Sequence, residues 1–190
     1  MTKQVKMLFG AIPDTLEEFS KLSQITQAEA MKFFIEHFWI GKWRRTGIIW
    51  WNLLDGCPQF SDAIVDYYFN RKLAFFYIRQ SQQPVCLMFD EPENGAVTLF
   101  AVNDTMVDRK ITYRVKDLQD DRIVGSSEIT VRANSSKATA VFPEEKSATV
   151  WEMEWETAGQ VCRNHYTWGL IPLDHEKYLQ LIRKTGLYRI

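Results

Sequence analysis

The sequence lacks the features that define several large classes of protein. Only 3 cysteines occur, at Cys57, Cys86 and Cys162, and an odd, widely spaced set argues against a disulfide framework and for reduced thiols. No stretch approaches the roughly 20 consecutive apolar residues of a membrane span, and the first residues contain no apolar run of signal-peptide length. We therefore expect a chain that is not exported and that works in the cytoplasm.

Charge, metal and cofactor motifs are also scarce. The formal net charge of -1 gives no overall attraction for nucleic acid or for an anionic membrane. Neither a glycine-rich phosphate loop nor a nucleophile elbow is present. Cys162 and His165 point to opposite faces if they lie in a strand, and no second pair completes a tetrahedral site. We expect no cofactor, no metal, no nucleic-acid partner and no membrane partner.

Apolar residues are plentiful, at 46% of the chain, which predicts a folded core. Up to residue 83 the pattern is mainly helical. Thr15 and Glu18 form a capping box, as do Thr26 and Glu29. The expected elements are an irregular lead-in over residues 1–13, a short helix after Thr15, a second helix from Thr26 to about Ile40, a loop from Ser61 to Tyr68, and a helix from Arg71, capped by Asn70, to about Gln80.

After Pro84 the hydrophobic period changes to two, and turn residues separate short strands. The predicted strands are Val85–Phe89, Ala96–Asn103, Lys110–Asp117, Ile123–Val131, Ala138–Phe142, Thr149–Glu156 and Gln160–Thr167. Seven such strands favour an immunoglobulin-like β-sandwich over residues 84–169. A capped helix from Asp174 to about Lys184 then forms a C-terminal helical tail, residues 170–190.

Residues 149–156 alternate between large apolar side chains and glutamates. Three neighbouring carboxylates would suit acid/base chemistry, but strict alternation is what a half-buried strand produces without any chemistry. We therefore interpret the glutamates as a solvated face. The apolar side chains are Trp151, Met153 and Trp155, and the glutamates are Glu152, Glu154 and Glu156.

The stretch Gly47–Pro58 begins as a compact run of β-branched and aromatic residues, Thr46 to Trp51, which predicts a buried parallel strand. Two adjacent tryptophans in a strand face opposite sides, so one can pack under a helix while Trp51 reaches a pocket. Asn52 and Asp55 add polar groups at the strand's carboxyl end, which is the active-site face of a β/α barrel. The alternative is a strand with two core tryptophans followed by a polar turn.

Three stretches, Gln27–Glu36, Gly47–Pro58 and Asp66–Tyr68, resemble the end of the catalytic barrel in β-mannosidase-type enzymes of glycoside hydrolase family two. The family's central segment is approximately Gly-x-x-Tyr-Trp-Gln-Leu-Asn-Asp-x-Trp-Pro. The chain matches it at Gly47, Trp51, Leu53, Asp55 and Pro58. It departs from the family pattern with Asn52 for Gln, Leu54 for Asn, Cys57 for Trp, and Trp39 where a helix end often has Arg.

The resemblance implies an α+β fold, in which residues 1–83 are a remnant of the last βα unit of a (β/α)8 barrel and an immunoglobulin-like sandwich follows. It implies a retaining hydrolase that uses two glutamates. Both would precede Met1, so we expect no catalytic residue here and no activity from this chain alone. By the match, Trp51 would be a stacking wall for the sugar, Asn52 and Asp55 would support it, and a cis peptide would follow Trp51 in the intact barrel.

A second hypothesis is a non-catalytic carbohydrate-binding or protein-interaction module built on the sandwich. Under either hypothesis a single parallel strand leaves backbone groups unpaired and helices half uncovered. We therefore also expect self-association through residues 15–80.

Overall fold

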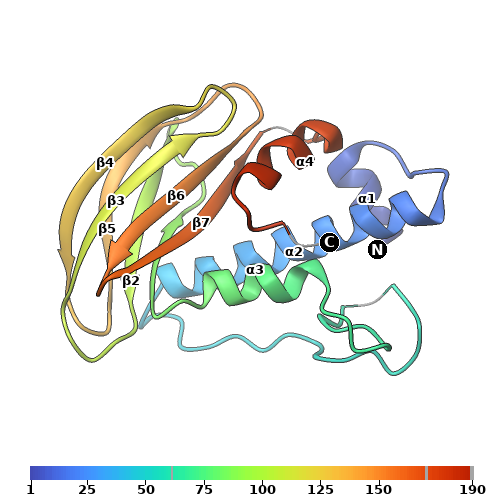
Figure 1. The fold of residues 1–190 in the computed structure, drawn as a ribbon, viewed down its shortest axis with the longest axis horizontal. Helices are drawn as coiled ribbons and strands as arrows, with labels where there is room; N and C mark the ends of the chain where they lie inside the picture. Colours follow the sequence, from blue (N-terminus) through green and yellow to red (C-terminus); the bar gives the residue numbers. More distant parts are fainter. Residues whose placement is uncertain (61, 170, 189–190) are drawn as a thin grey trace.

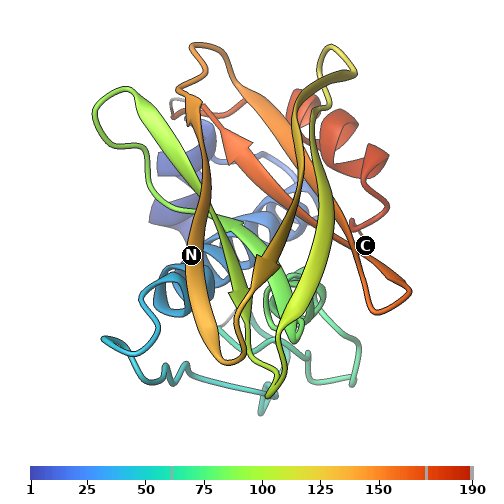
Figure 2. The ribbon, with the colours of Figure 1, turned by 90° about the vertical axis from the view of Figure 1, so that its left-hand side faces the viewer.

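The computed structural model describes residues 1–60, 62–169 and 171–188, and it has a β-sandwich packed beside a group of helices (Figure 1). Figure 2, seen from the sandwich end, places the sheets in front of the helices. The helices are α1 (Thr2–Phe9), α2 (Leu16–Ile40), α3 (Leu73–Ser81) and α4 (His175–Lys184). The strands are β1 (Val85–Phe89), β2 (Ala96–Asn103), β3 (Arg109–Asp117), β4 (Arg122–Val131), β5 (Ser135–Pro143), β6 (Thr149–Thr157) and β7 (Gln160–Trp168).

The sandwich consists of a three-stranded sheet in the order β1-β2-β5 and a four-stranded sheet in the order β4-β3-β6-β7. All strand pairs in both sheets are antiparallel. The predicted α+β class and the seven predicted strands are therefore confirmed, and two of the strands have the predicted bounds. Turn residues and period-two burial determine these strands locally, which is why the sequence reveals them.

The core of the sandwich contains the side chains that the alternation in β6 places inward. Trp151 and Trp155 are each 1% exposed, and Met153 is 0% exposed. On the other face, Glu154 lies 2.7 Å from Arg114 and 2.8 Å from Arg163. Glu154 therefore pairs with arginines on both neighbouring strands, as on a solvated sheet face.

α2 is one continuous helix of 25 residues, where two helices were predicted. Thr15 is the N-cap, and its side chain accepts a hydrogen bond from the Glu18 amide at 3.3 Å, as predicted. The second predicted cap is wrong, because the Thr26 hydroxyl donates to the Leu22 carbonyl at 2.8 Å within the helix. No proline or glycine interrupts residues 16–40, and burial of Ile25 and Ile35 (each 0% exposed) favours one uninterrupted helix.

The start of the chain also differs from its prediction. Residues 2–9 form α1 rather than an irregular lead-in, because Val5 is fully buried and Gly10 ends the helix in a left-handed conformation at φ 82°. α3 starts at Leu73, and Lys72 is its N-cap. Asn70 is not the cap, since its side-chain amide contacts Asp66 at 3.1 Å. Of the predicted loop from Ser61 to Tyr68, Ser61 lies outside the described residues.

The predicted buried strand from Thr46 to Trp51 is wrong. These residues form an extended segment beside α3 (Figure 1), and their backbone makes no hydrogen bond to any part of the chain that the structure describes. Burial still alternates, because Ile48 and Trp50 pack against the helical core while Ile49 is 98% exposed. The segment is extended and alternates in burial like a strand, but the described residues provide no neighbouring strand with which it could form a sheet.

A buried polar network joins the helices to the sandwich. Glu29 of α2 accepts hydrogen bonds from the Thr167 hydroxyl of β7 at 3.0 Å and the Tyr178 hydroxyl of α4 at 2.7 Å. Glu36, about two helical turns further along α2, accepts a hydrogen bond from the Asn164 side-chain amide of β7 at 2.7 Å. Buried polar groups need such partners, so this network holds α2 against strand β7.

Candidate functional site

The loop after the extended segment folds back on itself. The amides of Val65 and Asp55 donate to the carbonyls of Leu53 and Val65 at 3.0 and 3.1 Å, and the Ile64 amide donates to the Asn52 carbonyl at 3.3 Å. Leu54 and Val65 form a short parallel bridge. These bonds hold residues 52–55, which carry two of the three predicted site residues, in a defined position.

Trp51 and Asn52 stand where the extended segment enters this loop. The peptide bond between them is cis, as the resemblance implies for the intact barrel. The Trp51 side chain is 80% exposed. The Asn52 Oδ1 atom is buried, and the described residues provide no hydrogen-bond partner for it.

Asp55 faces the interior and is 3% exposed. Its Oδ2 atom lies 2.6 Å from the Lys72 ammonium, which stands at the start of α3. The Gln59 amide donates to Oδ1 of the same carboxylate at 3.4 Å. Asp55 thus anchors the loop to α3. Sequence reasoning missed Lys72, because no local pattern links a lysine to a carboxylate in a different segment.

A cavity of about 190 Å³ lies beside this ion pair, and Lys72 is among its lining residues. Its aromatic lining comes from Phe60, Tyr67 and Tyr68. Trp51 does not line it, so the structure does not bring the predicted stacking residue and this cavity together. The Asp66–Tyr68 part of the motif marks this cavity in the sequence.

Large apolar side chains are exposed along the extended segment and the loop, on a surface that we call the open face. Monomeric proteins seldom expose large contiguous apolar patches, which makes this surface a candidate for contact with other protein or with ligand. Its members and their exposed fractions are Ile49 98%, Trp51 80%, Leu53 65%, Leu54 39%, Phe60 45%, Tyr67 47%, Tyr68 67% and Phe69 76%.

Trp39 and Cys57 also depart from the family pattern, and both lie outside the open face as defined. Trp39 packs against both hydrophobic cores, that of the sandwich and that of the helices. Cys57 is an exposed free thiol. Trp39 therefore has a packing role, whereas the structure gives Cys57 no contact that would explain its place in the motif.

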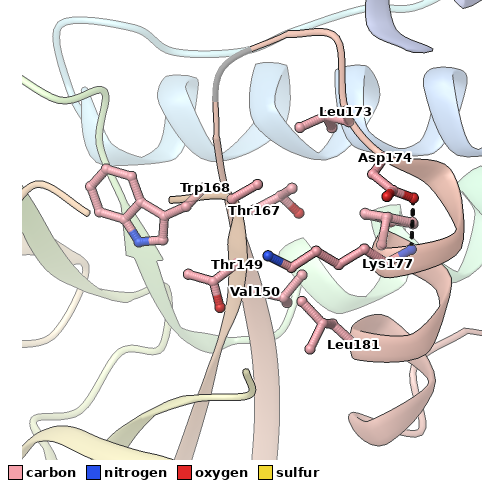
Figure 3. A pocket seen from close by; sticks show the side chains of 10 residues that line it. Thr149, Val150, Thr167, Trp168, Leu173, Asp174, Lys177 and Leu181 are labelled. Carbon is pink, nitrogen blue, oxygen red and sulfur yellow. Dashed lines mark hydrogen bonds between the residues drawn. The ribbon is translucent and has the colours of Figure 1, made fainter. Parts of the chain in front are cut away.

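Another cavity, between α4 and strands β6 and β7, is too small for a sugar. Its volume is about 20 Å³, which holds a single water molecule. Figure 3 shows Lys177 extending across it toward the strands, while the Lys177 amide bonds to the Asp174 carboxylate at 3.0 Å. Across residues 1–60, 62–169 and 171–188, no group of three His, Cys, Asp or Glu side chains could hold a metal ion. No helix in the same ranges is long and apolar enough to cross a membrane.

Two solved structures that resemble this chain are a mannosidase and a chitosanase. The β-D-mannosidase from Dictyoglomus thermophilum matches with a TM-score of 0.76 and 26% identity, over 90% of this chain and 22% of that chain. The exo-chitosanase from Amycolatopsis orientalis matches with a TM-score of 0.69 and 16% identity, over 87% of this chain and 21% of that chain. The second likeness concerns the fold alone.

A sequence relative points to the same enzymes. The chain is 33% identical to β-mannosidase B of Thermothelomyces thermophilus over 81 residues, which are 40% of this chain and 9% of that protein. No family model matches. The chain therefore spans about a tenth of this relative and about a fifth of the solved structures. These findings confirm the resemblance to the C-terminal part of a family two glycoside hydrolase that the motif predicts.

Proposed function

We propose that this chain is a part of a retaining β-glycosidase of the β-mannosidase type and contributes one wall of its sugar site. In this proposal, residues 1–83 are the end of the catalytic barrel, residues 84–169 an accessory immunoglobulin-like sandwich and residues 170–190 a helical tail. Leu170, Arg189 and Ile190 of that tail lie outside the described residues. Both catalytic glutamates would come from barrel strands that precede the last one.

The observation that carries the proposal is the extended segment with Trp51 at its end. A strand of a closed barrel pairs on both sides, and the backbone of residues 46–51 is open on both sides within the described parts. On one side of the segment, Ile48 and Trp50 pack against the core that α2 and α3 help to form, as a barrel strand packs against its helices. The exposed rings of the open face would then meet the rest of the barrel and the sugar.

Each of the three site residues has its own role under this proposal. Trp51 would stack on the sugar, because its ring is exposed at the carboxyl end of the segment. Asn52 would support it, since its buried Oδ1 is an acceptor without a partner in the described residues. Asp55 would hold the loop through Lys72 rather than touch the sugar.

The coding sequence upstream of Met1 is the first test. A continuous reading frame that contains the two glutamate strands supports the proposal, and the whole protein should hydrolyse nitrophenyl β-mannoside. In that protein, Trp51→Ala should lower kcat/KM about tenfold, the size expected for one lost aromatic contact. Trp43→Ala is the matched control, because Trp43 is also exposed, at 62%, but lies outside the open face.

The isolated chain provides the second test. It should release no nitrophenol, because it has neither glutamate strand; hydrolysis by the purified chain would contradict the proposal. Without the rest of a barrel, we further propose that copies of the chain associate through residues 15–80, which include the open face. Light scattering that shows only monomers over a wide concentration range would count against this association.

A further inference from the structure

A cavity of about 230 Å³ lies where α2 meets the end of β7 and the segment that leads to α4. We call it the junction pocket. No residue of the open face lines it. Its lining residues are Leu8, Glu29, Lys32, Phe33, Glu36, Phe89, Tyr166, Thr167, Gly169, Ile171 and Leu173. It is somewhat smaller than the roughly 300–1,000 Å³ of sites for drug-sized ligands, so its size suits a single small ring.

Two charged side chains are buried at this pocket. Lys32 and Glu36 are each 3% exposed, and the Lys32 ammonium lies 2.8 Å from Glu36 Oε2. An ammonium has three N–H donors, and the described residues offer Lys32 no other hydrogen-bond partner. The other carboxylate oxygen of Glu36 is occupied by the Ser81 hydroxyl at 3.0 Å and the Asn164 amide. Lys32 is therefore a buried donor with unused capacity, held in place by Glu36.

Glu29 supplies the matching acceptor. All of the hydrogen bonds that the described residues make to this carboxylate end on its Oε1 atom. The donors are the Thr167 hydroxyl, the Tyr178 hydroxyl and the His165 Nε2 atom, the last at 3.0 Å. Burial raises the pKa of Glu29, but the contacts with His165, Lys32 and Tyr178 outweigh it and lower the pKa to about 2. Within the described residues, the Oε2 atom of this ionised carboxylate has no partner. The pocket thus presents a fixed anionic acceptor and a fixed cationic donor.

The remaining walls are largely apolar. Phe33, Phe89 and Tyr166 contribute aromatic rings, and Phe33 is 45% exposed. The two carboxylates outnumber the one lysine, which disfavours an anion, while the ammonium disfavours a cation. A neutral ring with several hydroxyls satisfies both groups, because each hydroxyl both donates and accepts, and its C–H faces pack on aromatic rings.

We propose that the junction pocket binds one neutral monosaccharide ring. Glu29 Oε2 accepts from a hydroxyl of the sugar, the Lys32 ammonium donates to a second hydroxyl, and Phe33 and Tyr166 flank the ring. Charge-assisted bonds of this kind are stronger than neutral ones, which favours a polyhydroxyl ligand over an apolar one of equal size. This site is separate from the open face and does not depend on the chain being part of a glycosidase.

The test is calorimetric titration of the full chain with D-mannose, D-glucose, D-galactose and N-acetylglucosamine. One or more of them should bind with a Kd of about 1–10 mM, the affinity of a small ligand held by a few polar contacts. Glucosamine and glucuronate are the charged controls. Tighter binding of either charged sugar than of every neutral one would overturn the proposal, as would no binding of any neutral sugar.

A pair of neighbouring phenylalanines locates the binding. Phe33 and Phe34 are both 45% exposed on α2, but only Phe33 lines the junction pocket. Phe33→Ala should weaken binding about tenfold, whereas Phe34→Ala should leave it unchanged. Lys32→Ala would remove the donor but would also leave the buried Glu36 carboxylate without its ion-pair partner. The two phenylalanine variants are therefore the ones that locate the binding site. Equal effects of Phe33→Ala and Phe34→Ala would place the sugar elsewhere and overturn the assignment.

Discussion

Trp51 and Trp151 are the same residue type, but one is exposed and the other is buried in its region of the molecule. Trp151 is 1% exposed in the sandwich and stacks edge-on against Phe89 and Trp168, while Trp51 is 80% exposed at the end of a segment with no paired backbone in the described residues. The sandwich pairs the backbones of its strands and buries Trp151 in its core. In the other region, the backbone of residues 46–51 is unpaired within the described residues, and the Trp51 ring at its end is left exposed.

The largest expected difference between the two regions is in amide exchange. Amides of β3 and β6 are central in their sheet and should exchange only on global unfolding, a cost of roughly 5–15 kcal/mol for a domain. Amides of residues 46–51 should exchange at nearly the rate of an unstructured peptide. Hydrogen exchange with mass spectrometry measures both.

The same measurement, repeated at rising protein concentration, sharpens the comparison. Protection of residues 46–51 that grows with concentration would show that copies pair along this segment. Strong protection at every concentration would contradict the open backbone.

The two tryptophans give the second largest effect. Trp151→Ala should lower the free energy of unfolding by about 3–5 kcal/mol, because it empties a packed core position. Trp51→Ala should change it by less than about 0.5 kcal/mol, as for other exposed side chains. Urea denaturation followed by circular dichroism distinguishes them. A large loss from Trp51→Ala would mean that this ring is covered in solution.

The contact between helix α2 and the sandwich, where Glu29 is buried, is tested by the dependence of stability on pH. The pKa of Glu29 is about 2 in the folded chain, against an ordinary value of 4.5, so the unfolded chain binds the proton more tightly. Its stabilising contribution is present above pH 4.5 and is lost as the pH falls toward 2, and it amounts to about 3 kcal/mol.

Urea titrations between pH 6 and 2 measure this loss. Glu29→Gln should flatten the dependence of the unfolding free energy on pH in that range, and Glu17→Gln is the control on the exposed start of the same helix. An unchanged slope in Glu29→Gln would show that other carboxylates govern acid unfolding.

The smallest effect concerns the start of α2. Thr15→Ala removes the acceptor for the Glu18 amide and should lower the free energy of unfolding by about 1 kcal/mol. Thr26→Ala is the control, because the Thr26 hydroxyl only bonds within the helix and alanine favours the helical conformation. A loss from Thr26→Ala as large as that from Thr15→Ala would contradict the single uninterrupted helix.

The sequence predicts the sandwich well because its signals are local. Val85–Phe89 and Ala96–Asn103 have the bounds that alternation and turn residues predict, and the other strands extend by up to three residues at an end. The segment Thr46–Trp51 has a strand's composition, but a strand also needs neighbours, which no local pattern reveals. Likewise, a capping box at Thr26 is only a signal, and helix continuity through buried Ile25 outweighs it.

The motif names Trp51, Asn52 and Asp55 but not the side chains that position them. The motif identifies Trp51, and the structure places that ring on the surface. The partners that position the rest, Lys72 for Asp55 and Tyr178 with His165 for Glu29, come from distant segments. Contacts of that kind follow from tertiary packing, and one sequence contains no record of them.

The continuous helix α2 also has a consequence for where recombination could divide this chain during evolution. Its 25 residues extend over about 37 Å and contribute Glu29 and Glu36 to the sandwich while Ile25 and Ile35 serve the helical core. Recombination between α3 and β1 would give each product a helix or a sheet with buried polar groups whose partners had been lost. The helices and the sandwich are therefore expected to pass through evolution as one heritable unit, with exchange of modules confined to other positions in the gene.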